Sequence, residues 1–129
     1  METRYRVLVV DDEDAILFSY QKLLQGTVVD VHGCATFEEA IALIKSERYC
    51  AVITDLRLSH SESYEGLEIL QYIKNHELTM PVIVLTGYGS DAIKDFALAL
   101  GAYGYLDKPV AITEVIKLLN NIGIPAGEF

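Results

Sequence analysis

The chain alternates between two hydrophobic patterns. Five short runs are rich in aliphatic and β-branched residues, and several are apolar at consecutive positions, which is typical of strands buried on both faces of a parallel sheet. The predicted strands are Tyr5 to Val10, Thr27 to Gly33, Cys50 to Asp55, Pro81 to Thr86 and Ala102 to Leu106. A sheet of this kind needs other elements to cover both of its faces.

Segments with apolar residues three or four positions apart separate these runs and predict helices. The first has Leu17, Tyr20 and Leu24 on one side and stops before Gly26, and the second begins with a capping-box pattern of Thr36 and Glu39. The predicted helices are Asp14 to Gln25, the segment after Thr36, Gly66 to Asn75, Ser90 to Leu100 and Ile112 to Asn120. This alternation predicts a doubly wound α/β domain, with a five-stranded parallel sheet, five helices and right-handed crossovers.

Polar side chains follow the apolar runs where the predicted strands end. Asp11 and Asp12 follow the first run, Asp55 ends the third, and Thr86 and Lys108 come at the ends of the fourth and fifth. Because the carboxyl ends of parallel strands open onto one crevice, these side chains are expected to converge. Three carboxylates, a hydroxyl and an ammonium predict a site for a divalent cation and a phosphoryl group.

Electrostatics supports a cation there independently. Carboxylates about 5 Å apart repel by roughly 3 kcal/mol per pair at an effective dielectric constant near 20, so the fold needs a counter-ion or a raised pKa. Hard oxygen donors suit magnesium. The simpler alternative is that Asp11 or Asp12 caps the first helix, which would not account for both acids.

Length and composition predict one domain. The 129 residues are 51% hydrophobic, which is ample for one core. We place the domain at residues 1–122 and interpret residues 123–129, with their glycines and proline, as a linker or tail. The chain shows neither an apolar stretch of membrane-spanning length nor a secretory signal, so we expect a cytoplasmic location without membrane contact.

Charge and cysteine usage argue against a nucleic-acid-binding domain and against a disulfide or cysteine metal site. The net charge of −9, from 10 basic and 19 acidic residues, disfavours direct binding of nucleic acid by this domain. Cys34 and Cys50 are isolated, in neither a paired motif nor the spacing of a known metal site, which predicts reduced thiols packed near strand ends.

Four sequence motifs resemble the receiver domain of bacterial two-component response regulators. They are Val9-Val-Asp-Asp-Glu13, Thr54-Asp-Leu56, Pro81-Val-Ile-Val-Leu-Thr-Gly87 and Gly101-Ala-Tyr-Gly-Tyr-Leu-Asp-Lys-Pro109. The resemblance covers nearly the whole chain and implies a flavodoxin-like sheet with strand order 2-1-3-4-5. It also implies a signalling switch that assists its own phosphorylation and dephosphorylation, rather than an enzyme.

The resemblance assigns the chemistry of the site. It implies that Asp55 accepts a phosphoryl group from a histidine kinase or phosphotransfer protein. It further implies that Asp11 and Asp12 bind Mg²⁺ together with Asp55 and the backbone carbonyl of Arg57. A strand-end carboxylate is rigidly held and nucleophilic without a base, which suits this role. An Asp55 that only caps the following turn is the alternative.

The resemblance also assigns a switch. Lys108 would pair first with a carboxylate and then with a phosphoryl oxygen, aimed by a cis peptide bond before Pro109. Thr86 would contact the phosphoryl group, and Tyr105 would move inward and alter the face of the fourth helix, fifth strand and fifth helix. That face would contact a downstream effector domain or protein, or form a homodimer with a second copy of this chain. Tyr103 is expected on the same face as Tyr105.

Other side chains near the site are expected to tune hydrolysis of the acyl phosphate. Arg57 and Tyr88 each lie two residues beyond a site residue, where bulk or charge obstructs or positions the attacking water, and we expect Tyr88 to shield the phosphate. Gly87 leaves room for the phosphoryl group, although a simple turn role is an alternative.

One segment departs from the family pattern. Asp55 and Gly66 are eleven residues apart, longer than is usual, and the proline usual in this loop is missing. We interpret Leu56 to Glu65 as a polar, mobile loop and, in the simpler interpretation, as a harmless surface insertion. The alternative hypothesis is that His60 or Glu62 approaches the site and alters phosphate lifetime or partner choice. For the chain as a whole, the alternative function is a phosphorylation-independent interaction domain, which would typically lose Asp55, Lys108 or the acidic pair.

Overall fold

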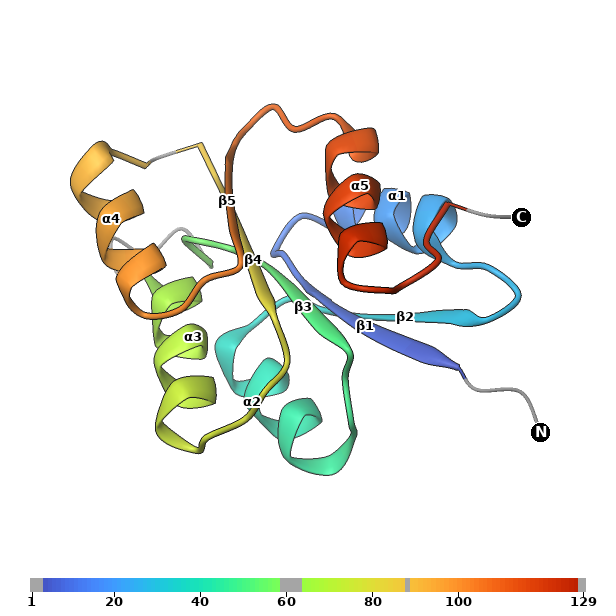
Figure 1. Ribbon diagram of the computed structural model, residues 1–129, viewed down its shortest axis with the longest axis horizontal. Coiled ribbons are helices and arrows are strands. Elements are labelled where there is room, and N and C mark those ends of the chain that lie inside the picture. The colour runs from blue at the N-terminus through green and yellow to red at the C-terminus, as the bar shows by residue number, and fades with distance from the viewer. Residues whose placement is uncertain (1–3, 59–63, 88, 128–129) are drawn as a thin grey trace.

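A computed structural model describes residues 4–58, 64–87 and 89–127 (Figure 1). His60, Glu62 and Tyr88 lie outside the described residues, so the roles expected of them stay predictions. Within these ranges, no helix combines the length and apolarity needed to cross a membrane.

The five strands form one parallel sheet in the order β2-β1-β3-β4-β5, as predicted. The strands are β1 (Tyr5–Val10), β2 (Val29–Cys34), β3 (Ala51–Asp55), β4 (Val82–Thr86) and β5 (Gly104–Asp107). Parallel pairing places the carboxyl ends of β1, β3 and β4 at one edge of the sheet, where the predicted site lies.

Five helices cover both faces of the sheet. They are α1 (Asp14–Leu24), α2 (Phe37–Ser46), α3 (Glu65–Asn75), α4 (Asp91–Ala99) and α5 (Ile112–Asn121). Helices α1 and α5 pack on one face, and α2, α3 and α4 on the other (Figure 1). The doubly wound architecture is therefore confirmed.

Two apolar clusters account for the unbroken hydrophobic runs in the strands. In β1, Leu8 and Val10 belong to the cluster under α2, α3 and α4, whereas Val7 and Val9 belong to the cluster under α1 and α5. Because successive side chains alternate between faces, a strand covered on both faces is apolar at every position.

Local hydrogen bonds set where elements begin and end. Thr36 caps α2, because the amide of Glu39 donates to its hydroxyl, and that hydroxyl in turn donates to the Glu39 carboxylate rather than leaving it to the Thr36 amide as in a full capping box. The predicted start of β2 at Thr27 was wrong, since Gly26 N–H donates to the carbonyl of Val29 and closes a turn. Strand β5 begins after Ala102, whose amide still bonds to the carbonyl of Ala97 at the end of α4.

Apolar packing extends beyond the predicted domain boundary. Gly123 adopts a positive φ of 91° after α5, and the chain then turns back so that Ile124 and Ala126 lie buried against the α1 and α5 side of the sheet. The boundary at residue 122 remains a prediction, but the side chains that follow it contribute to the core.

The connection between β3 and α3 begins inside the core. Leu56 and Leu58 are completely buried, so the interpretation of Leu56 to Glu65 as polar and mobile was wrong for these two residues. The amide of Gly66 donates to the carbonyl of Leu56 at 2.9 Å, which joins the two ends of the connection. We call this bond the Leu56–Gly66 latch. It holds the start of α3 against the end of β3.

The two cysteines are free, as predicted, and differ in burial. Cys34 is buried, which raises the pKa of its thiol to about 12, whereas Cys50 is partly exposed. Since the thiolate is the reactive form, iodoacetamide at pH 8 should alkylate Cys50 roughly tenfold or more faster than Cys34 in the native protein. Peptide mass spectrometry measures both rates, and unfolding in urea should equalise them. Equal rates in the native protein would contradict the burial of Cys34.

Candidate functional site

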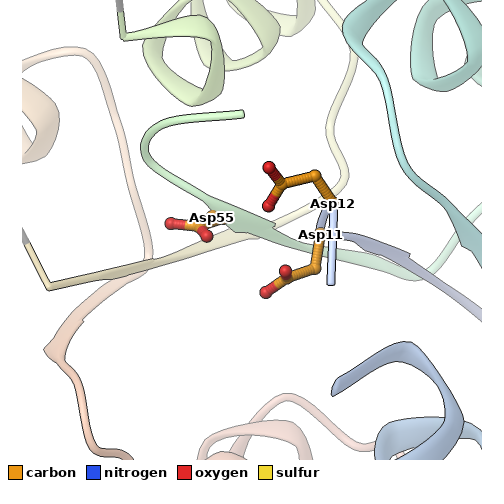
Figure 2. Close-up of side chains that lie close together, drawn as sticks. All are labelled: Asp11, Asp12 and Asp55. Carbon is orange, nitrogen blue, oxygen red and sulfur yellow. The ribbon is translucent and has the colours of Figure 1, made fainter. Parts of the chain in front are cut away.

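Three carboxylates meet at the carboxyl edge of the sheet (Figure 2). Asp11 and Asp12 directly follow β1, and Asp55 is the last residue of β3. One carboxylate oxygen from each lies within 4.8 Å of the other two. Asp11 and Asp55 are buried, at 2% and 7% exposure, and Asp12 is partly exposed. The convergence expected from the strand ends is therefore found in the structure.

Backbone hydrogen bonds fix the acidic pair. The amide of Asp11 donates to the carbonyl of Cys34 at 3.0 Å, and its Oδ1 accepts the amide of Glu13 at 2.9 Å. Glu13 is the N-cap residue of α1, so neither Asp11 nor Asp12 occupies the capping position that we considered as an alternative. Asp11 instead anchors the turn that leads into the helix, and one of its carboxylate oxygens remains directed at the site.

Lys108 brings a positive charge to the same site. Its Nζ lies 2.9 Å from Asp55 Oδ2 and 3.4 Å from Asp11 Oδ2. Its backbone amide donates to the carbonyl of Thr86 at 2.7 Å, and the Lys108–Pro109 peptide bond is cis. The end of β5 is thus tied to the end of β4, and the lysine reaches across the sheet edge to the acids.

Burial and charge shift the pKa values of these groups in defined directions. Burial raises the pKa of Asp11, and the Asp55 charge adds to this, while the Glu13 amide and Lys108 oppose it. Burial alone would lower the pKa of Lys108, but the hydrogen bond to Asp55 and the charges of Asp55 and Asp11 raise it. Lys108 is therefore held as an ammonium ion.

The donor set fits a hard divalent cation. Among the described residues, the three carboxylates meet the ammonium group of Lys108, which leaves an excess of negative charge in this group when the acids are ionised. Their oxygens lie close enough together to share one ion, and carboxylate oxygens with room for water suit magnesium. The arrangement can bind such a cation beside the carboxylate of Asp55.

Thr86 and Tyr105 lie beside the site on β4 and β5. Thr86 is buried at the end of β4, and Tyr105 packs at the edge of the cluster under α2, α3 and α4. Burial is the main cause that raises the pKa of Tyr105, with smaller contributions from Asp107 and Tyr64. Tyr103 precedes β5 and is 41% exposed, so the two tyrosines have distinct environments.

Of the residues expected to tune hydrolysis of the acyl phosphate, the structure describes Arg57 and Gly87. The guanidinium of Arg57 lies over the ring of Tyr64, 5.9 Å from its centroid. A Cβ added to Gly87 would have Lys108 Cβ at 4.0 Å as its nearest neighbour, so this position is open. The tuning roles of Arg57 and Gly87 remain predictions.

Two neighbours of the site went unpredicted, Tyr64 and Gly89. The sequence signal for Gly89 was the repeated glycine of Gly87-Tyr-Gly89, although it gives no indication of what fills the space beside it. Tyr64 carries no recognisable signal, because its ring lies under Arg57, and its charge influences the pKa of Tyr105, only once α3 is packed.

Comparison with known proteins gives a family match over most of the chain. Residues 7–120 match the model of the response regulator receiver domain. A response regulator of Rickettsia bellii described as NtrX-like is 34% identical over 113 residues, which are 88% of this chain and 23% of that protein. The response regulator protein PilR of Pseudomonas aeruginosa is 32% identical over 117 residues, 91% of this chain and 26% of that protein. The chain thus spans about a quarter of the length of these relatives.

Solved structures agree with the sequence comparison. The receiver domain of the Francisella response regulator 1452 superposes with a TM-score of 0.82 at 26% identity, covering 92% of this chain and 96% of that one. A CheY-like receiver domain protein from Methanospirillum hungatei superposes with a TM-score of 0.83 at 29% identity, covering 92% and 93% of the two chains.

Proposed function

This chain belongs to the receiver domain family of response regulators, the signalling domains of two-component systems, and from that premise we propose that Asp55 is its phosphoacceptor. The observation that carries the proposal is the position of the Asp55 carboxylate, which ends β3 inside a cluster of acids with the Lys108 ammonium 2.9 Å away. A fixed carboxylate beside a fixed cation is suited to nucleophilic attack on a phosphoryl group.

The donor is a phosphohistidine on a histidine kinase or phosphotransfer protein. A carboxylate oxygen of Asp55 forms a bond to phosphorus while the P–N bond of the donor breaks, and the electron pair returns to the imidazole nitrogen, which takes up a proton. The product is an acyl phosphate on Asp55. Lys108, which now pairs with Asp55 and Asp11, is positioned to pair with a phosphoryl oxygen after transfer.

Asp11, Asp12 and Asp55, with the backbone carbonyl of Arg57, would hold Mg²⁺. When bound, the ion neutralises charge on the phosphoryl group and orients it for in-line transfer. The excess of carboxylates over ammonium groups at the site supports this assignment.

The output is a change at the face formed by α4, β5 and α5. The Thr86 hydroxyl contacts the phosphoryl group and thereby stabilises Tyr105 in its inward position, which biases this face toward a second arrangement. Phe96, Leu98 and Tyr103 support the choice of face, because these large apolar side chains are 55%, 43% and 41% exposed on α4 and just before β5. The partner is a downstream effector domain or protein, or a second copy of this chain.

The test is incubation with acetyl phosphate, with Mg²⁺ or with EDTA, followed by intact mass measurement at neutral pH. We expect a phosphoryl adduct on the wild type only with Mg²⁺, and none on Asp55→Asn, which keeps the size of the side chain and removes its nucleophilic charge. An adduct on Asp55→Asn would place the acceptor elsewhere. If neither protein forms an adduct while a known receiver does so in the same assay, the chain is a phosphorylation-independent interaction domain.

A further inference from the structure

Gly89 leaves a space that the Tyr105 side chain occupies. A Cβ atom added to Gly89 would overlap the Tyr105 hydroxyl oxygen and would lie 3.0 Å from Tyr105 Cζ and 2.9 Å from Thr86 Cγ2. Carbon atoms in favourable contact are about 3.5–4.0 Å apart. In the observed arrangement, therefore, any side chain at position 89 collides with both Tyr105 and Thr86.

The glycine at this position is required for space rather than for backbone geometry. Gly101, Gly123 and Gly127 have positive φ angles, and Gly89 is not among the glycines in that region. An alanine at position 89 is thus free of the strain that a left-handed conformation would impose. Its effect should come from the collision with its neighbours.

The surroundings of the Tyr105 hydroxyl contribute little that would stabilise it there. The oxygen is buried, and among the described residues it has no hydrogen-bond partner. A buried hydroxyl without a partner is disfavoured relative to one in water. The ring is held by packing against the cluster under α2, α3 and α4. Packing of the ring thus lowers the free energy of the inward position of Tyr105, whereas burial of the hydroxyl without a partner raises it.

We propose that Gly89 is a positioning residue that keeps the inward position of Tyr105 open, so that the hydroxyl occupies it before any phosphoryl group arrives. A side chain at position 89 closes this position and drives Tyr105 outward. That the inward position is the signalling one rests on the proposed function. The steric relation between Gly89 and Tyr105 does not.

Nitration of tyrosine by tetranitromethane tests the proposal in the full chain without any phosphoryl donor. The reagent needs a phenolate in contact with solvent, so Tyr105 should react more slowly than Tyr103, which is 41% exposed. We expect Gly89→Ala to raise the nitration rate of Tyr105 several-fold relative to that of Tyr103. Fragmentation of the peptide that contains both residues separates their signals.

Gly87→Ala is the matched control. It adds the same methyl group two residues away, where the nearest neighbour is Lys108 Cβ at 4.0 Å. The ratio of Tyr105 to Tyr103 nitration should stay at its wild-type value in this variant. A ratio that is unchanged in Gly89→Ala, or equally raised in both variants, overturns the proposal.

A stability comparison covers the case in which Gly89→Ala is too unstable for nitration. Tyr105→Phe removes the oxygen that an added Cβ would overlap. The loss in urea midpoint caused by Gly89→Ala should therefore be smaller in the Tyr105→Phe background than in the wild type. Equal losses in the two backgrounds contradict the proposal. If the nitration pattern holds while acetyl phosphate leaves no adduct, the steric role of Gly89 stands and the proposed function fails.

Discussion

Replacing Gly66 with alanine should destabilise the fold by about 3 kcal/mol, the upper part of the usual range for overpacking. The added Cβ would overlap the carbonyl oxygen of Asp55 and would lie 2.9 Å from Leu56 Cα. These are backbone atoms at the end of a central strand, and they cannot rotate away as a side chain can. Gly66 lies in α3, where alanine would otherwise gain up to about 1 kcal/mol in helix propensity, so the collision reverses the expected sign.

Urea unfolding of both proteins measures this difference. The control is Gly33→Ala, whose added Cβ would have the side chains of Gln21 and Leu17 as its nearest neighbours, at 3.4 Å, and we expect it to change stability by less than about 1 kcal/mol. A Gly66→Ala protein as stable as the wild type would show that α3 can withdraw from β3. In that case, the position of Asp55 would not depend on this contact.

Replacing Lys108 with methionine should have opposite effects on two properties of the site. Phosphorylation by acetyl phosphate should slow on the order of 100-fold, because the ammonium that contacts Asp55 is no longer present to stabilise developing phosphoryl charge. Affinity for Mg²⁺ should rise roughly tenfold or more, since the ammonium competes with the ion for the carboxylates of Asp55 and Asp11.

Intact mass against time gives the rate, and titration calorimetry gives the affinity. Lys45→Met is the matched control, because it removes one positive charge from the exposed surface of α2 and should leave both properties near their wild-type values. A phosphorylation rate for Lys108→Met within threefold of the control, after saturation with Mg²⁺, would rule out the assigned role of Lys108.

The sheet could be predicted because its strands are buried on both faces. A run such as Val7 to Val10 divides its side chains between two cores and is therefore apolar throughout. The ends of the elements could not be predicted as well, since hydrogen bonds in turns set them. The amides of Gly26 and Ala102 bond within turns, and the hydrophobic pattern carries no trace of either bond.

Some features of the site could likewise be predicted from the sequence, and others could not. The proximity of Asp11, Asp55 and Lys108 could be predicted from the sequence. In a parallel sheet, the topology alone places the carboxyl ends of the strands at one edge. The space that Gly89 leaves for Tyr105 could not be predicted, because it depends on the path of a loop and the rotamer of one side chain.

The Leu56–Gly66 latch has a consequence for how this family can diversify. It ties both ends of the β3–α3 connection to one point, so that residues added after the buried Leu58 need not move the start of α3 away from the end of β3. Lengthening a closed loop is inexpensive, at about 0.6 kcal/mol for each doubling. We therefore expect this place to accept added residues, with sequences that distinguish one partner from another, while the hydrogen bond keeps α3 beside the site.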